Sequence, residues 1–184
     1  MLLEDMLRYN YEFVNEEKFK DYETDKFPNK NAVIFTCMDT RLVELLPKAL
    51  NLKNGDVKMV KNAGAILDNP YDSIMRSLLV AVYELQADEV FVIGHHGCGM
   101  KGFNSEGITE RMQVQGVTAD DFEQVKESNV DLNQWLKGFN SVEESVKKSV
   151  ETIRNHPLLP EDTPVHGLVI DPATGKLDLI ENGY

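Results

Sequence analysis

The sequence is poor in several residue types, and each scarcity excludes a class of protein. Only two of the 184 residues are cysteine, which is too few for a small secreted fold held by disulfides. Lysine and arginine number 19 against 31 aspartates and glutamates, so the formal net charge is −12. A surface of that sign repels nucleic-acid phosphates and anionic membranes, so neither is an expected partner. No apolar run approaches the roughly 20 residues that span a bilayer.

The first residues also lack the features of an export signal. They have no basic start, and Glu4 and Asp5 interrupt the apolar stretch. We therefore expect a cytoplasmic location, where the two cysteines would be thiols or metal ligands instead of a disulfide. Residues 1–24 space their apolar side chains roughly as on a helical face, which predicts an N-terminal helical arm that packs on its own core or on a second subunit.

Short apolar runs alternate with helical patterns along the rest of the chain. The predicted strands cover residues 32–36, 57–61, 89–93, 165–170 and, as an antiparallel edge strand, 177–180. Pro47 is expected to break the first helix between them or to start a new one. The alternation predicts a single α/β domain over residues 1–184, with a mainly parallel central sheet of four strands plus an antiparallel edge strand, flanked by helices. Sites in such sheets lie beyond the carboxyl ends of the strands.

Reactive side chains follow two of these strands. Cys37, Asp39 and Arg41 stand at alternate positions after the first strand, and His95 and Cys98 follow the third. Thiolates and a neutral imidazole are ligands that zinc accepts, and three protein ligands with an open fourth position are typical of a catalytic site. The sequence therefore predicts that Cys37, His95 and Cys98 hold one Zn²⁺ per chain.

Two roles are open for Asp39. Beside Arg41 it should stay ionised, and an ionised carboxylate accepts hydrogen bonds without donating them. It would then orient a zinc-bound water or hydroxide toward an electrophile. In the other role Asp39 binds the zinc as a fourth ligand, displaces the water and closes the site. The spacing allows both.

Each of these residues also has a plainer interpretation. A free cysteine is usually core packing, and an exposed Asp–Arg pair adds only about 0–1 kcal/mol to stability. Their conjunction favours a site, because the chain's only two cysteines, a histidine and the Asp39/Arg41 pair all fall at the ends of two predicted core strands. Nucleotide binding through residues 94–102 is a weak hypothesis, since no P-loop or dinucleotide fingerprint follows the strand.

In these motifs the sequence resembles the β-class carbonic anhydrases, and most closely the compact prokaryotic branch. That family carries C-x-D-x-R after its first core strand and H-x-x-C after a later one, which stand here as residues 37–41 and 95–98. Residues 61–64, Lys-Asn-Ala-Gly, resemble the family's R/K-N-A-G loop. The chain differs from the common pattern at Gly97, where many members have Asp, and at Ala65, where many have Asn.

The resemblance implies a lyase that reversibly hydrates carbon dioxide to bicarbonate and a proton, by attack of zinc-bound hydroxide oriented by an Asp39/Arg41 dyad. It implies zinc as the cofactor and a homodimer or a multiple of dimers as the assembly. Two thiolates donate more charge to zinc than imidazoles do, so activity should rise toward alkaline pH. Carbon dioxide is small and apolar, and the candidate walls of its pocket are Met38, Gly64, Ala65 and Ile66.

Two alternatives stay open. A related zinc hydrolase acting on carbonyl sulfide or carbon disulfide would use the same ligands and release sulfide. A non-catalytic zinc or redox-sensing module would use Cys37 and Cys98 to respond to oxidation. His96, next to an expected ligand, is a candidate proton shuttle because the pKa of histidine lies near neutrality, although a plain loop residue is the simpler interpretation.

Overall fold

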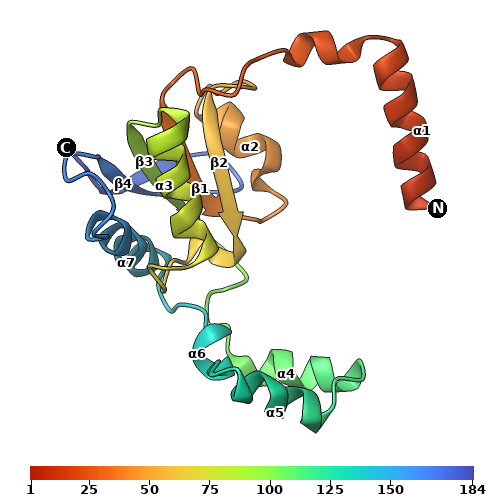
Figure 1. The fold of residues 1–184 in the computed structure, drawn as a ribbon, viewed down its shortest axis with the longest axis vertical. Coiled ribbons are helices and arrows are strands. Elements are labelled where there is room, and N and C mark those ends of the chain that lie inside the picture. Colours follow the sequence, from red (N-terminus) through yellow and green to blue (C-terminus); the bar gives the residue numbers. More distant parts are fainter.

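The computed structural model describes residues 1–184 and contains one five-stranded sheet in the order β2-β1-β3-β4-β5 (Figure 1). The first four strands along the chain are parallel, and β5 runs antiparallel to β4 at one edge. The predicted mainly parallel sheet with an antiparallel edge strand is therefore confirmed. The strands are β1 (Ala32–Cys37), β2 (Val57–Asn62), β3 (Glu89–His95), β4 (Val165–Ile170) and β5 (Leu177–Glu181).

Seven α-helices and two 3₁₀ helices complete the fold, and none of the helices is long and apolar enough to cross a bilayer. The 3₁₀ helices are η1 (Lys18–Tyr22) and η2 (Ala63–Ala65). The α-helices are α1 (Leu2–Asn15), α2 (Leu42–Ala49), α3 (Ser73–Leu85), α4 (Ser105–Val114), α5 (Ala119–Glu127), α6 (Leu132–Trp135) and α7 (Val142–Arg154).

The two faces of the sheet are covered unequally. Helices α3 and α7 pack on one face, where 18 buried residues including Phe35 and Leu78 form the larger core cluster. On the other face the short helix α2 buries Leu42 and Leu46 in a cluster of seven. One eight-residue helix cannot cover five strands, so part of this second face keeps an apolar pocket.

Glycines allow α7 to lie directly on the strands. A Cβ atom at Gly94 would be 2.7 Å from Cγ2 of Val142 and 2.8 Å from Cγ2 of Val146. A Cβ atom at Gly167 would be 2.8 Å from Cγ1 of Val146. A glycine in a strand commonly marks such a close approach. Because Gly94 immediately precedes His95, the packing of α7 also fixes the end of β3, where that histidine stands.

The expected helix break at Pro47 is wrong, because α2 continues through this residue to Ala49. Proline removes the N–H that would bond the carbonyl of Val43 four residues earlier. Val43 is exposed, so water can satisfy its carbonyl, while the buried side chains of Leu42 and Leu46 hold the helix on the sheet.

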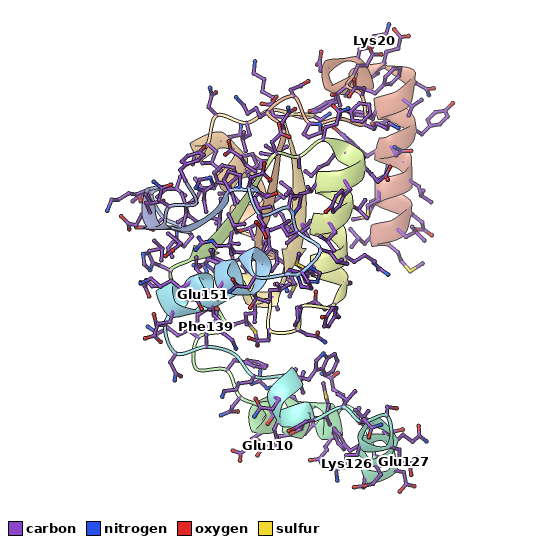
Figure 2. All side chains as sticks on the ribbon, turned by 60° about the vertical axis from the view of Figure 1, so that its left-hand side comes forward. Lys20, Glu110, Lys126, Glu127, Phe139 and Glu151 are labelled. Carbon is purple, nitrogen blue, oxygen red and sulfur yellow. The ribbon has the colours of Figure 1, made fainter.

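Two helical segments stand apart from the sheet (Figures 1 and 2). The first is the N-terminal segment with α1 and η1, neither of which buries a residue. The second is the hairpin of α4, α5 and α6, in which Ser105 is the one buried residue. Backbone hydrogen bonds from Gly102 to Phe139 (2.8 Å) and from Gly138 to Phe103 (3.0 Å) join this hairpin to the body.

Candidate metal centre

The topology brings the three expected ligands to one place. Strand β1 ends at Cys37 and strand β3 ends at His95, and these strands are parallel neighbours, so their carboxyl ends meet at one edge of the sheet. The turn after β3, with Gly97 at φ 63°, returns Cys98 to the same point. One side-chain ligand atom from each of Cys37, His95 and Cys98 lies within 4.8 Å of the others, and all three residues are buried.

The two sulfurs have the spacing that a tetrahedral zinc site needs. Their Sγ atoms are 4.0 Å apart, and two thiolates at about 2.3 Å from one tetrahedral ion would be about 3.8 Å apart. The amide of Gly64 donates to Sγ of Cys37 (3.3 Å), and the amide of Met100 donates to Sγ of Cys98 (3.5 Å). Such donors stabilise sulfur in its thiolate form, which is the form that binds metal.

His95 presents one ring nitrogen to the sulfurs. Its Nδ1 lies 3.0 Å from the carbonyl oxygen of His96, which assigns the proton of the neutral ring to Nδ1. The lone pair is then on Nε2, which is buried and has no hydrogen-bond partner. Buried polar atoms are nearly always paired. An unpaired imidazole nitrogen beside two thiols therefore fits a metal ligand, and the donor set as a whole fits zinc.

The two cysteines interact through their sulfurs. The hydrogen bond with Cys98 outweighs burial and lowers the pKa of Cys37. The same hydrogen bond, together with burial, raises the pKa of Cys98. Burial disfavours the imidazolium of His95, but the adjacent Cys37 thiolate and the His96 carbonyl outweigh it and raise the pKa of His95. A divalent cation would replace these protons, since metal ligands bind in their deprotonated forms.

Asp39 lies against this cluster and is held by Arg41. Its Oδ1 accepts from the backbone N and the Nε of Arg41, both at 2.9 Å, and its Oδ2 accepts from a terminal guanidinium nitrogen at 2.8 Å. These bonds hold the pKa of Asp39 well below its usual range. Oδ2 is also 3.7 Å from Nε2 of His95. Arg41 makes a further bond to the carbonyl of Gly97 (2.9 Å), so it joins the two loops of the centre.

The remaining predicted residues divide into buried and exposed ones. Gly64 and Ala65 are buried, and Ile66 is half-buried. Gly64 bonds the sulfur of Cys37, whereas Ala65 packs in the larger core cluster. Met38 is 66% exposed, so within one chain it does not form a closed wall. His96 is half-exposed, with Nε2 3.9 Å from a carboxylate oxygen of Asp178.

Both departures from the common family pattern fall at left-handed positions, with Ala65 at φ 54° and Gly97 at φ 63°. Asparagine and aspartate tolerate this conformation better than alanine, for which it costs roughly 1–2 kcal/mol, and glycine adopts it freely. Glycine at position 97 therefore adopts the left-handed turn without conformational strain. Alanine at position 65 leaves strain in its loop.

The sequence did not indicate the amides that bond the sulfurs. Every residue except proline carries an amide N–H, so no residue type marks the donors Gly64 and Met100. The small-residue loop at residues 62–65 was the one available signal, because it indicated that backbone approaches something closely there.

The fold and the clustered side chains define a class, that of α/β proteins with a Cys₂His metal-type centre at the carboxyl ends of central parallel strands. A family model described as carbonic anhydrase matches residues 32–177, which contain this centre. The chain belongs to the β-class carbonic anhydrase family. It is accordingly an enzyme of the carbonic anhydrase type, a lyase, as the sequence motifs indicated.

Relatives and solved structures agree with this membership. A Bacillus subtilis (strain 168) protein named "Putative carbonic anhydrase YtiB" is 58% identical over 183 residues, which cover 100% of this chain and 98% of the relative. A carbon disulfide hydrolase from Acidithiobacillus thiooxidans is 27% identical, covering 81% of this chain and 76% of the relative. The crystal structure of β-carbonic anhydrase isoform I from Trichomonas vaginalis matches with a TM-score of 0.90 and 34% identity, with full coverage of both chains.

Proposed function

We propose that this protein hydrates carbon dioxide reversibly to bicarbonate and a proton, with one zinc ion held by Cys37, His95 and Cys98. The observation that carries the proposal is the ionised carboxylate of Asp39, fixed by Arg41 at 3.7 Å from Nε2 of His95. A bound zinc ion would supply, near neutral pH, a nucleophile made from water. The chain would supply the ligands of the zinc ion, the group that orients the nucleophile and the pocket for carbon dioxide.

In this proposal Asp39 is an orienting group. Because Arg41 keeps it ionised, Asp39 accepts a proton donor's hydrogen bond and cannot itself donate one. Arg41 fixes both carboxylate oxygens, so the direction of the acceptor lone pairs is set before substrate arrives. Both carboxylate oxygens are bonded to Arg41, and these bonds compete with a role of Asp39 as a fourth metal ligand. That closed arrangement would require breaking the bond from Oδ2 to the guanidinium.

The substrate pocket proposed for carbon dioxide is formed by Gly64, Ala65 and Ile66. The side chain of Asn62 accepts from the amide of Ile66 (3.2 Å) and donates to its carbonyl (2.7 Å), so this loop is held as a rigid unit. Apolar walls suit a small uncharged molecule. In a polar pocket such a molecule would displace water without replacing its hydrogen bonds. We place Met38 at the rim of the same pocket.

The function is tested by stopped-flow carbon dioxide hydration between about pH 6.5 and 9, on protein whose zinc content per chain is assayed in parallel. We expect activity that rises with pH, because two thiolate ligands make the centre a weak Lewis acid. Full zinc with no hydration at any pH would contradict the proposal and favour a binding or sensing role. A flat rate across this range would contradict the pH argument alone.

Carbon disulfide hydrolysis is a second candidate, because a relative at 27% identity bears that name. The reaction consumes one carbon disulfide and two waters and yields carbon dioxide and two hydrogen sulfides. Release of sulfide from carbon disulfide, measured on the same preparation, separates it from carbon dioxide hydration. The relative named "Putative carbonic anhydrase YtiB", at 58% identity, supports carbon dioxide as the first candidate.

We further propose a cytoplasmic homodimer in which the arm of one protomer covers the sheet of the other. Residues 1–24 carry three basic and seven acidic side chains, a net charge of 3 − 7 = −4. Residues 26–61, which form β1, α2 and β2, carry seven basic and three acidic side chains, a net charge of 7 − 3 = +4. The two segments are thus complementary in charge.

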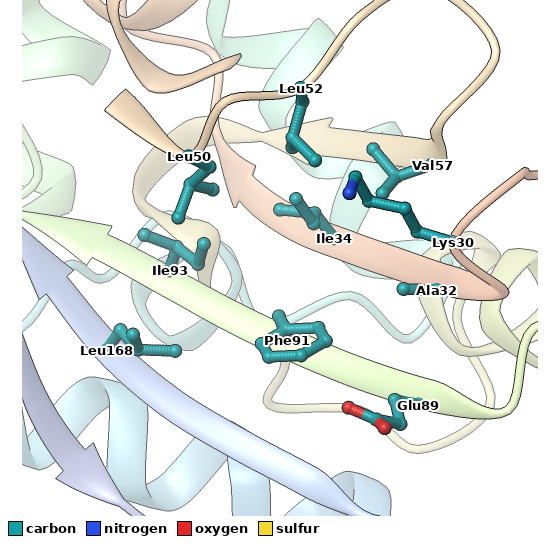
Figure 3. Close-up of a pocket in the computed structure, with 10 residues that line it drawn as sticks. All are labelled: Lys30, Ala32, Ile34, Leu50, Leu52, Val57, Glu89, Phe91, Ile93 and Leu168. Atoms are coloured by element: carbon teal, nitrogen blue, oxygen red, sulfur yellow. The ribbon is translucent and has the colours of Figure 1, made fainter. Parts of the chain in front are cut away.

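They are complementary in polarity as well. In α1 the side chains of Leu3, Met6 and Leu7 are all at least 59% exposed. The sheet face beside α2 holds an apolar pocket of about 210 Å³ with Lys30 at its edge (Figure 3). Both features are apolar surface that a partner could cover. A second copy of the chain supplies both surfaces at once, which favours a symmetric exchange of arms.

Deleting residues 1–24 is expected to convert the dimer to a monomer, because the deletion removes the apolar and acidic surface of the arm. Light scattering on the purified truncated protein measures the change in mass. The matched control replaces Leu3 and Leu7 by serine in the full-length chain, which keeps the charge and removes the apolar contacts, and should weaken the dimer as well. An unchanged dimer after truncation would contradict the exchange.

A further inference from the structure

Helix α7 carries one buried polar side chain, that of Ser149, which is 1% exposed. The other buried residues of this helix are apolar and belong to the larger core cluster. A hydroxyl inside a helix ordinarily bonds the carbonyl one turn earlier, and those of Ser77 (2.7 Å) and Thr152 (2.9 Å) do so in this protein. Ser149 instead makes its hydrogen bonds outside its own helix.

The hydroxyl of Ser149 bonds the loop after β2 at two points. Its Oγ accepts from the amide of Leu67 (3.1 Å) and donates to the carbonyl of Ala65 (3.2 Å). A serine hydroxyl has one proton to donate and lone pairs to accept with, so it serves as donor and acceptor at once. Both loop residues are buried, which means that water cannot replace these bonds. Ser149 therefore fixes residues 65–67 to α7.

The same loop reaches the metal centre. The amide of Gly64, two peptide units before the carbonyl of Ala65, donates to Sγ of Cys37 at 3.3 Å. Ala65 itself is held in a left-handed conformation at φ 54°. A residue other than glycine keeps such a conformation only where its surroundings hold it. The bond from Ser149 to the Ala65 carbonyl supplies that restraint from the core.

The other contacts of the loop do not replace this restraint. The side chain of Asn62 bonds the amide and the carbonyl of Ile66, and so it closes the loop on itself. Lys148, next to Ser149, pairs with Asp68 at 2.5 Å, but the two side chains are 65% and 49% exposed. Exposed ion pairs contribute little to stability. The buried hydroxyl is therefore the main tie between the loop and α7.

We propose that Ser149 is a positioning residue of the metal centre, which aims the amide of Gly64 at the sulfur of Cys37 by holding Ala65 in place. Its hydroxyl bonds none of the three expected ligands, so it acts through the loop. Gly64 and Ala65 are also walls of the pocket proposed for carbon dioxide. The expected effect on catalysis rests on the proposed function, whereas the effect on the Cys37 sulfur does not require activity.

Amide hydrogen exchange, followed by NMR on the full-length zinc-loaded protein, tests the restraint. In Ser149→Ala the amide of Gly64 should exchange about tenfold faster than in the wild type, while that of Val92 in the middle of β3 keeps its rate. Ser145→Ala is the matched control, because Ser145 lies one turn earlier on α7 and its side chain bonds neither Ala65 nor Leu67. A wild-type rate at Gly64, or equal acceleration at Gly64 and Val92, would overturn the proposal.

Cobalt(II) in place of zinc tests the link to the sulfur. A hydrogen bond to a metal-bound thiolate withdraws electron density from it, so its loss should move the sulfur-to-cobalt charge-transfer band to lower energy. We expect this shift in Ser149→Ala and none in Ser145→Ala. Faster exchange at Gly64 with an unchanged band would show that the loop can loosen without affecting Cys37, which contradicts the proposed role.

Kinetics and a conservative variant complete the test. Ser149→Ala should lower kcat/KM for carbon dioxide hydration roughly tenfold, the lower end of the effect expected for outer-shell partners. Ser149→Thr keeps the hydroxyl and should restore the wild-type exchange rate at Gly64 and most of kcat/KM. A threonine variant with the wild-type unfolding temperature that behaves like Ser149→Ala would show that the hydroxyl is not the group that matters.

The two proposals fail separately. A wild-type protein with full zinc and no hydration would sink the proposed function, while the exchange rates and the cobalt band still decide the role of Ser149. An active wild type, with a Ser149→Ala variant that keeps the exchange rate of Gly64 and the cobalt band, would remove Ser149 from the centre and leave the function standing.

Discussion

Replacing His95 by alanine is expected to abolish zinc binding and, with it, carbon dioxide hydration. The imidazole supplies the single nitrogen of the centre, and its Nε2 is buried among the sulfurs with no other partner. Loss of an outer-shell partner alone costs about 10–100-fold in metal affinity, so loss of a ligand should cost more. Zinc per chain, assayed after dialysis against a weak chelator, should fall from about one to near zero.

The neighbouring histidine provides the matched control. His96 is half-exposed and its side chain is not in the ligand cluster, so His96→Ala should keep about one zinc per chain. Its carbonyl, which accepts from Nδ1 of His95, belongs to the backbone and survives the substitution. Equal zinc content in the two variants would contradict the assignment of His95 as a ligand. If His96→Ala keeps its zinc but hydrates carbon dioxide more slowly, a part of His96 in proton transfer is indicated.

Replacing Arg41 by alanine is expected to lower carbon dioxide hydration by roughly 10–100-fold while zinc stays bound. The substitution removes two of the three donors that fix Asp39, leaving the bond from the backbone amide to Oδ1. The freed carboxylate can then turn toward the metal centre, because Oδ2 already lies 3.7 Å from Nε2 of His95. The substitution also removes the hydrogen bond from the Arg41 side chain to the carbonyl of Gly97, which joins the two loops of the centre.

The conservative variant separates charge from geometry. Lysine keeps the positive charge but cannot make the paired hydrogen bonds of a guanidinium to a carboxylate. If orientation of Asp39 matters, Arg41→Lys should be nearly as slow as Arg41→Ala, with unchanged zinc per chain. Full activity in Arg41→Lys would mean that the charge alone is needed, and full activity in Arg41→Ala would remove Asp39 and Arg41 from the proposed mechanism.

Much of the fold could be predicted because its signals are local. The apolar runs that become β1, β3 and β4 are buried on both faces, and such strands read as continuous hydrophobic stretches. The helix break predicted at Pro47 was wrong because the effect of this proline depends on tertiary packing. Its effect on helix α2 depends on whether the carbonyl of Val43 reaches water, and that is decided by how the helix lies on the sheet.

Residue identity and short spacing were enough to predict the candidate ligand types, the Asp–Arg pair and the strand ends that carry them. The folded structure was needed to bring the sulfurs of Cys37 and Cys98 together, to place the amide of Gly64 on Cys37 and to bond Arg41 to the carbonyl of Gly97. It also showed that the arm and the hairpin bury almost nothing within one chain. Contacts between residues far apart in the chain depend on how the elements pack, and no local pattern encodes them.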